Sequence, residues 1–179
     1  MKIEIVDESK MSADLDAKIR GALVECFPKD AAHFSRSRDW HGSWPTFSVV
    51  ATDENGDVAG HIGVVDRVVT VGDQPLRVAG LQNVCVVPAS RKTGLFDRLM
   101  EGVLQESARR SFDMGLLFCR EPLRKAYARF GWLDVSDRPA IRVDDGVEVP
   151  LPSHAGAMVF PMAVKALPAG AFHLRGNDW

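Results

Sequence analysis

Residues 83–96 read NVCVVPASRKTGLF, and the strongest structural signal of the chain lies here. An apolar run ends at Pro88, and a short basic segment with one glycine then leads into apolar residues at helical spacing. Proline ends a strand because it has no N–H to donate to the ladder. The pattern therefore predicts a strand, a tight turn and an amphipathic helix in direct succession.

A turn of this kind is suited to binding an anion. The first amides of a helix have no partner inside the helix, and the helix dipole adds about half a positive charge at that end. Arg91 and Lys92 raise the local positive potential, and Gly94 lets a ligand approach the backbone closely. The segment lacks the Gly-Lys-Ser/Thr of a P-loop and the three glycines of a dinucleotide fingerprint. The residues alone thus leave two interpretations, a phosphate or pyrophosphate site and an ordinary structural turn.

The rest of the chain alternates between strand and helix patterns around this segment. Apolar periodicity and turn residues predict strands over 2–6, 47–52, 58–71, 76–87, 114–119, 132–135, 140–143 and 157–164, and helices over 14–27, 30–40, 94–111 and 122–131. Asn55-Gly56 is a strong hairpin signal between the second and third strands. Three strands in succession before the next helix argue against a doubly wound dinucleotide fold. We expect one mixed α/β domain of the α+β type.

The composition excludes several classes of protein. The chain has 179 residues, of which 46% are hydrophobic and 26% charged, as in an ordinary globular protein. The formal net charge of -2 lacks the basic excess of a protein that binds nucleic-acid phosphates nonspecifically. The N-terminus lacks the layout of a signal peptide, and no apolar run approaches the ~18 residues of a membrane span. We expect a cytoplasmic protein with no nucleic-acid or membrane partner.

The three cysteines, Cys26, Cys85 and Cys119, are odd in number and stand in apolar runs. Their spacing fits neither a zinc site nor a disulfide framework. We expect reduced, buried thiols and no metal.

The turn segment resembles motif A of the GNAT superfamily of N-acetyltransferases. That pattern is a strand ending in V-x-P, followed by Arg/Gln-x-x-Gly-x-Gly/Ala. Here Val86-Val87-Pro88 precede Arg91-Lys92-Thr93-Gly94-Leu95-Phe96, with Phe96 where the family prefers Gly or Ala. The resemblance implies that the loop from Arg91 to Phe96, together with Val86 and Val87, binds the pyrophosphate end of coenzyme A.

A second similarity lies downstream, in residues 125–132. The sequence KAYARFGW resembles the Tyr-x-x-x-Gly-Phe found in many GNAT enzymes, with Trp132 in place of Phe. Tyr127 is the one tyrosine of the chain. The resemblance implies that its phenol protonates the leaving thiolate, whereas a helical tyrosine taken alone is more often structural. Arg120 stands where many relatives have Asn, so that pantetheine contact has no support.

The resemblance implies a fold and a reaction. The fold would be GNAT-like, with a central, largely antiparallel sheet, parallel and splayed fourth and fifth strands, and flanking helices. Residues 1–179 would form a single acyl-CoA N-acyltransferase domain. An amine of a small molecule or peptide would attack acetyl-CoA directly, and a backbone N–H near Val86 would stabilise the oxyanion. A homodimer is one assembly that the resemblance allows.

The residue that deprotonates the amine is less well defined. Glu121 follows the fifth strand and would border the cleft, although it is equally a solvated carboxylate at a helix start. His61 and Asp66 on the third strand are alternatives, as is a chain of water molecules. The loop from Trp40 to Trp44 and the tail from Leu174 to Trp179 are candidates to border the acceptor.

Two other functions stay open. A weaker similarity to nodulation-factor N-acyltransferases favours a longer acyl chain, delivered by acyl-CoA or an acyl carrier protein. A noncatalytic module that binds acyl-CoA is the other alternative.

Overall fold

The helices and strands follow the periodicity and turn signals closely. The computed structural model describes residues 1–152 and 154–179. The strands are β1 (Lys2–Asp7), β2 (Phe47–Thr52), β3 (Val58–Val71), β4 (Gln74–Val86), β5 (Met114–Cys119), β6 (Leu133–Asp134), β7 (Ala140–Asp144), β8 (Val147–Pro150), β9 (Gly156–Pro161) and β10 (Phe172–His173). The helices are α1 (Ala13–Cys26), α2 (Ala31–Phe34), α3 (Leu95–Arg109) and α4 (Glu121–Ala128).

Helix α2 is shorter than the helix expected over 30–40. The Ser35 hydroxyl donates to the Ala32 carbonyl, and the Ser37 hydroxyl bonds the Asp39 carboxylate. Such side-chain bonds compete with helical ones. Arg38 is 1% exposed and is bound by Glu8 and Asp16, which holds the segment in an irregular path.

The chain divides into two compact units. The first comprises Met1–Trp40, Trp44–Val64 and Gln82–Glu106, and the second comprises His41–Ser43, Val65–Leu81 and Ser107–Trp179. Strands β3 and β4 contribute residues to both.

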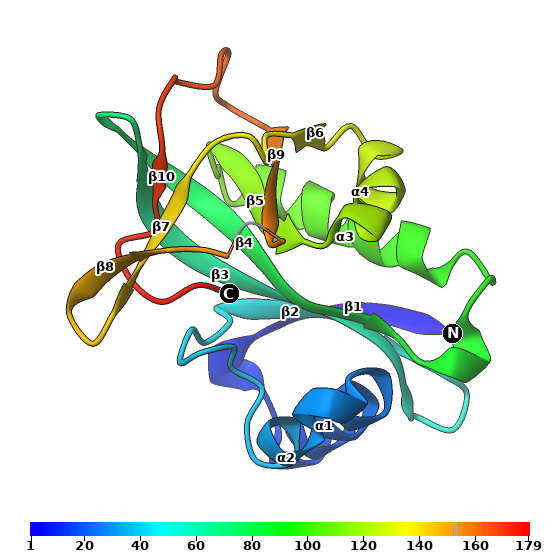
Figure 1. The fold of residues 1–179 in the computed structure, drawn as a ribbon. Coiled ribbons are helices and arrows are strands. Elements are labelled where there is room, and N and C mark those ends of the chain that lie inside the picture. Colours follow the sequence, from blue (N-terminus) through cyan, green and yellow to red (C-terminus); the bar gives the residue numbers. More distant parts are fainter. Residues whose placement is uncertain (153) are drawn as a thin grey trace. The chain divides into compact units, whose positions relative to one another are not determined.

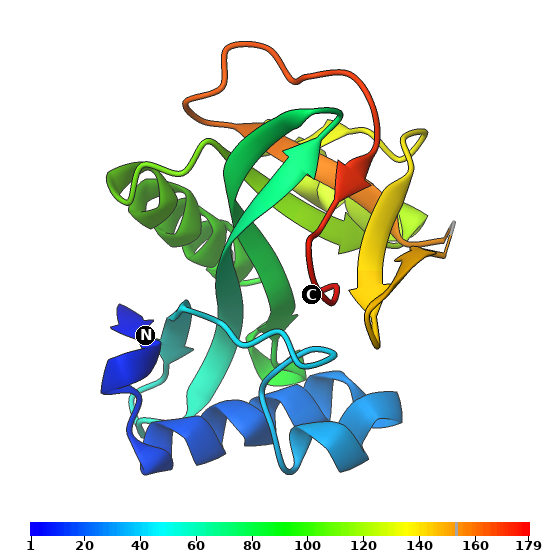
Figure 2. The same cartoon turned by 90° about the vertical axis from the view of Figure 1, so that its left-hand side faces the viewer.

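In the first unit, helices cover both faces of a small antiparallel sheet. β1 pairs with β2 from Lys2–Thr52 to Asp7–Phe47, and β2 pairs with β3. α1 packs Leu23 into a cluster with Val50 of β2 and Cys85 of β4, and Figures 1 and 2 both show α1 beside these strands. α3 lies on the other face, because a Cβ on Gly102 would lie 3.3 Å from the side chain of Val49. Neighbouring strand residues face opposite sides, so Val49 and Val50 join the sheet to two different helices.

The second unit contains a mixed sheet in the order β6-β9-β5-β4-β3-β10-β7-β8. β4 and β5 are parallel, with a register from Val78–Met114 to Leu81–Leu117, although β4 runs on to Val86 and β5 to Cys119. A cluster of buried side chains in this unit includes Val78, Leu116 and Trp179. The other face of β5 is covered by Trp132, whose ring would be 2.7 Å from a Cβ on Gly115.

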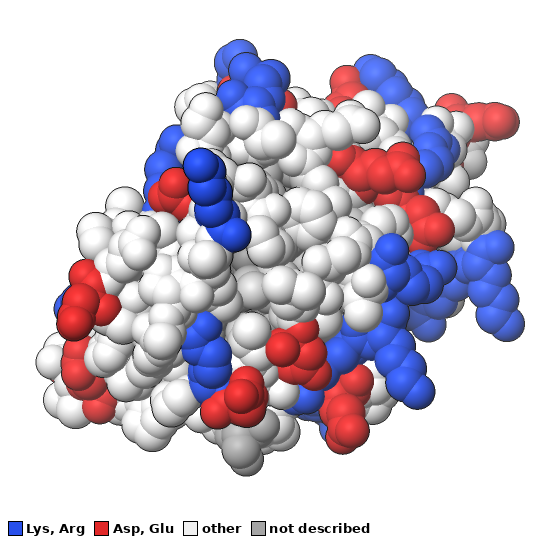
Figure 3. Space-filling model, turned by 90° about the horizontal axis from the view of Figure 1, so that it is seen from above, with Lys and Arg blue, Asp and Glu red and all other residues white. Residues whose placement is uncertain are grey.

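The architecture confirms the expected fold class. It is a mixed α+β arrangement with a parallel β4–β5 pair and flanking helices. None of the helices within residues 1–152 and 154–179 has the length and apolar character needed to cross a membrane. On the face that Figure 3 presents, positive and negative side chains both occur around a largely uncharged middle.

Candidate functional site

The turn between β4 and α3 is held by its own hydrogen bonds. After β4 ends at Val86, a single 3₁₀ turn spans Pro88–Ser90. The Ser90 amide donates to the Val87 carbonyl at 2.9 Å, and the Thr93 hydroxyl donates to the Ser90 carbonyl at 2.7 Å. Lys92 and Gly94 have positive φ angles of 64° and 78°, a region that favours glycine. These hydrogen bonds and backbone angles define the shape of the loop.

The outer surface of this turn is open. Arg91, Lys92, Thr93 and Gly94 are exposed, and a Cβ added to Gly94 would meet no atom within 4 Å. Leu95 is 2% exposed and fixes the first residue of α3 in the core. Two basic side chains thus stand at the N-terminal end of α3, where the helix dipole favours an anion. The geometry fits an anionic group such as a pyrophosphate.

Arg91 is anchored as well as exposed. Its Nε donates to the Val86 carbonyl at 3.2 Å. Val86, Val87 and Phe96 are half-buried beside the turn. The first unit thus contains the whole predicted cofactor set, residues 86, 87 and 91–96.

Asn83 interrupts β4 just before this turn. Its φ angle is 52°, unusual for a residue within a strand, and its amide donates to the Arg38 carbonyl at 2.7 Å. Its own carbonyl lies 3.1 Å from His61 Nδ1. The three residues fix the irregular strand from both sides. The sequence gives little sign of this kink, since asparagine is compatible with an ordinary strand.

Tyr127 and Glu121 both belong to α4, in the second unit. Tyr127 is 7% exposed, near the end of the helix, and its ring makes an edge contact with Trp132 at 6.2 Å between centroids. Burial, and secondarily the nearby Cys119, raise the pKa of its phenol. The phenol is therefore protonated throughout the neutral range. Glu121, by contrast, is exposed at the first residue of α4.

The two alternative bases are engaged in other contacts. His61 is fully buried, and its Nδ1 must donate to the Asn83 carbonyl, so that Nε2 is left to accept from the Ser48 hydroxyl at 3.1 Å. Burial lowers the pKa of His61 to about 4. Asp66 forms a two-point ion pair with Arg77, at 2.9 and 2.6 Å. Both arrangements fit structural roles.

The tail from Leu174 to Trp179 is folded onto the second unit. The Trp179 ring occupies the space above Gly80, its Nε1 donates to the Leu116 carbonyl at 3.3 Å, and Arg67 stacks on it at 5.1 Å. The Asp178 carboxylate lies 2.9 Å from both His41 and Arg142. Trp44, the last residue of the aromatic loop, is 53% exposed.

A family model described as an acetyltransferase (GNAT) domain matches residues 12–133, which is more than half of the chain. The chain belongs to the GNAT acetyltransferase family. The match includes the β4–α3 turn and Tyr127.

Solved structures agree with this membership at the level of the fold. A GNAT family N-acetyltransferase from Escherichia coli, solved in complex with CoA, is 20% identical, with a TM-score of 0.68 over 98% of this chain and 91% of that one. A GNAT family acetyltransferase from Brucella melitensis, solved with acetyl-CoA, is also 20% identical, with a TM-score of 0.64 over 96% and 94%.

The chain is also similar in sequence to two curated proteins. Nodulation protein A of Sinorhizobium terangae is 38% identical over 104 residues, which is 57% of this chain and 51% of that protein. Nodulation protein A of a Mesorhizobium strain is 32% identical over 108 residues. This GNAT chain thus matches about half the length of these curated relatives.

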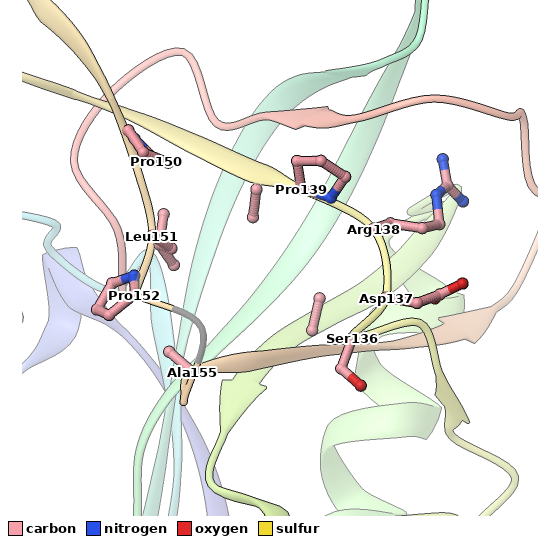
Figure 4. A pocket seen from close by; sticks show the side chains of 10 residues that line it. Ser136, Asp137, Arg138, Pro139, Pro150, Leu151, Pro152 and Ala155 are labelled. Carbon is pink, nitrogen blue, oxygen red and sulfur yellow. The ribbon is translucent and has the colours of Figure 1, made fainter.

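A separate hollow of about 240 Å³ lies in the second unit, and Figure 4 shows its lining. Its walls are mainly proline and alanine, with one basic and one acidic residue: Ser136, Asp137, Arg138, Pro139, Ala140, Pro150, Leu151, Pro152, Ala155 and Ala157. Arg138 is held by the Pro168 and Gly170 carbonyls. None of the predicted cofactor or catalytic residues lines this hollow.

Proposed function

We propose that this chain transfers an acyl group, in the first instance acetyl, from coenzyme A to a primary amine. The observation that carries the proposal is the exposed turn at Arg91–Gly94, which places two cations at the start of α3, where the helix dipole favours a diphosphate. Membership of the GNAT family supports CoA as the ligand. The acceptor is a small molecule or a peptide, and the reaction needs no metal.

The chemistry begins with attack of the neutral amine on the thioester carbonyl. The tetrahedral oxyanion then needs a donor that is already in place, and the backbone N–H near Val86 on β4 is the candidate. Glu121, exposed beside the start of α4, takes the proton from the amine, directly or through water. Holding both reactants in one orientation lowers the activation free energy by several kcal/mol, on the order of 7–11 kcal/mol at best.

Tyr127 supplies the proton that the departing thiolate needs. Its buried phenol keeps this proton at neutral pH because burial raises its pKa. A thiolate leaving into the same apolar surroundings also has its pKa raised, since burial penalises every anion. The proton transfer therefore does not become steeply unfavourable.

Calorimetry with acetyl-CoA tests the binding step. Gly94→Asp places a negative charge at the turn, and we expect it to weaken acetyl-CoA binding at least tenfold. The matched control is Gly146→Asp, because Gly146 has the same φ, 79° against 78°, and equally open surroundings in the β7–β8 turn. Wild-type protein that binds no acetyl-CoA at millimolar concentration would end the proposal.

Kinetics with an amine panel tests the role of Tyr127. We expect Tyr127→Phe to lower kcat by about 10²–10⁴-fold, the usual contribution of a general acid, with acetyl-CoA affinity nearly unchanged. A large loss of affinity with unchanged kcat contradicts the assignment.

A second candidate function is supported by the similarity to Nodulation protein A. Here the donor is a longer acyl chain on CoA or on an acyl carrier protein. A carrier presents phosphopantetheine without the adenosine diphosphate moiety, so Gly94→Asp would impair it less. Turnover with an acyl carrier protein and none with acetyl-CoA selects this function.

A further inference from the structure

Strand β1 forms one edge of the antiparallel sheet in the first unit. Within residues 1–152 and 154–179, β1 pairs with β2 and with no other strand, from Lys2–Thr52 to Asp7–Phe47. The outer side of β1 therefore carries backbone N–H and C=O groups that no neighbouring strand binds. Such an edge is a template on which another extended segment can pair.

The backbone groups that point outward belong to Ile3 and Ile5. The Glu8 amide donates to the Thr46 carbonyl at 2.9 Å, in continuation of the β1–β2 register. Hydrogen-bonded and non-hydrogen-bonded pairs alternate along an antiparallel ladder, so Glu4 bonds β2 whereas Ile3 and Ile5 do not. The N–H and C=O groups of these two isoleucines face away from the sheet.

The side chains of the same residues form an apolar stripe along the edge. Ile3 faces α3, because a Cβ on Gly102 would lie 4.0 Å from its side chain. Ile5 lies two residues further along the strand, so it is on the same face, and it is 44% exposed. Met1, which precedes the strand, is 45% exposed. An apolar surface at a sheet edge loses its contact with water when a second strand pairs there.

The opposite face of β1 carries two charges of opposite sign. Lys2 and Glu4 form an ion pair with each other, and their side chains are 69% and 44% exposed. Charges on an edge strand oppose pairing with most other strands. A second copy of this chain is different, because an antiparallel copy centred on Ile3 presents its Glu4 to Lys2 and its Lys2 to Glu4.

We propose that two copies of this chain associate through β1, which pairs antiparallel with itself about a two-fold axis at Ile3. In this register the backbones of the two Ile3 residues exchange hydrogen bonds, and Met1 lies opposite Ile5 of the second copy. Lys2 lies opposite Glu4 of the second copy, so charges of alternating sign occupy one face and apolar side chains the other. The surface is the same on both copies, so the assembly closes at a dimer.

Other registers that align the same faces are less favourable. An axis at Glu4 places this carboxylate opposite its own copy, and like charges directly opposite each other are destabilising. An axis at Ile5 places Ile3 opposite the carboxylate of Asp7. A shift by one residue sets the apolar stripe of one copy against the charged stripe of the other. The axis at Ile3 is therefore the register that matches charge and hydrophobicity together.

Sedimentation equilibrium of the untagged full chain, from about 2 to 200 µM, tests the association. A single strand pair is a small interface, so we expect a monomer–dimer equilibrium with a Kd of about 10–100 µM. Glu4→Lys and Lys2→Glu each place like charges opposite one another twice, because of the symmetry, and should raise the Kd at least about tenfold. Circular dichroism should show both variants folded, since these side chains are exposed.

Mixing the two charge variants gives the sharper result. An equal mixture of Glu4→Lys and Lys2→Glu restores opposite charges at every pair, so it should form a heterodimer with about the wild-type Kd. The double variant Lys2→Glu/Glu4→Lys should dimerise with itself for the same reason. A mixture that associates no better than each variant alone overturns the register.

A substitution in the apolar stripe tests the location of the interface. Ile5→Lys should raise the Kd at least about tenfold. The matched control is Val147→Lys, because Val147 is 63% exposed on β8, another edge strand, and the wild-type Kd should persist there. Amide hydrogen exchange should slow at Ile3 and Ile5 as the protein concentration rises.

Three results overturn the proposal. The first is a wild-type protein that remains monomeric at 200 µM, and the second is a dimer that Val147→Lys weakens and Ile5→Lys does not. The third is continued growth beyond the dimer. None of these measurements involves coenzyme A or an amine, so the interface and the proposed function can fail separately.

Discussion

Burial fixes the charge state of His61, and this has a consequence for acid stability. The ring is fully buried between Ser48 and the Asn83 carbonyl, and desolvation lowers its pKa to about 4. In the unfolded chain the pKa is near 6.5. Between pH 6.5 and 4 the unfolded state binds a proton that the folded state does not. The free energy of unfolding therefore decreases as the pH is lowered through this window. The full effect is about 3 kcal/mol, at 1.36 kcal/mol per pH unit.

We therefore expect His61→Gln to flatten the acid limb of the stability curve. Urea midpoints from pH 7.5 to 4.5 measure this, with His154→Gln as the exposed control. The variant should lose about 1–2 kcal/mol at neutral pH through its hydrogen bonds, but lose less than the wild type on acidification. The pKa of Asp16 is lowered by Arg38 and Arg20 despite its burial. Asp16 therefore also makes stability depend on pH, but by the same amount in the wild type and in both variants. Parallel pH slopes would refute the assignment.

At the level of elements, local signals gave correct boundaries where turn residues bound an apolar run. β2, β3 and β5 have the bounds that the sequence predicts. β8 was not expected, although Asp145-Gly146, with φ angles of 49° and 79°, is a hairpin signal that could have revealed it. β10 pairs with β7 and β3, which are far from it in the chain, and two residues carry no periodicity.

Two glycines in different elements give opposite expectations for one substitution. Gly80 on β4 faces Trp179, and a Cβ there would lie 2.3 Å from the indole ring. Gly21 lies within α1, and a Cβ there would meet nothing within 4 Å. Thermal unfolding should show Gly80→Ala destabilised by about 1–3 kcal/mol and Gly21→Ala stabilised by up to about 1 kcal/mol. Indole fluorescence should change only in Gly80→Ala. Unchanged stability and emission in Gly80→Ala would show that Trp179 does not occupy that space.

For the whole molecule, the division into two units determines which part of the chain a bound ligand stabilises. The predicted cofactor turn belongs to the first unit and α4 to the second. The sequence could place the turn because strand, proline, basic residues and glycine are consecutive. It could not place Asp178 against His41, because such a contact arises only when distant segments fold together. Assignments of Glu121 and Tyr127 stay predictions.

Acetyl-CoA at one hundred times its Kd should stabilise the folded protein by about 2.7 kcal/mol. For a chain of this length this corresponds to a rise in Tm of about 5–10 °C if both units unfold in one transition. Differential scanning calorimetry measures it, with Gly94→Asp as the protein that should respond at most about half as much at the same acetyl-CoA concentration. Two transitions, of which one moves, would show that the units unfold separately. A wild-type Tm that does not move at all contradicts binding at the turn.

The single tyrosine also makes this protein spectroscopically simple. Ionisation of a phenol increases the absorbance in the near ultraviolet, whereas the indole rings of the four tryptophans do not titrate, and this chain has one tyrosine. An alkaline titration of the native chain therefore follows Tyr127 alone, without any label. Because burial holds the phenol in its neutral form, the phenolate absorbance should appear at a higher pH than in free tyrosine. It should accompany the loss of ellipticity that marks unfolding.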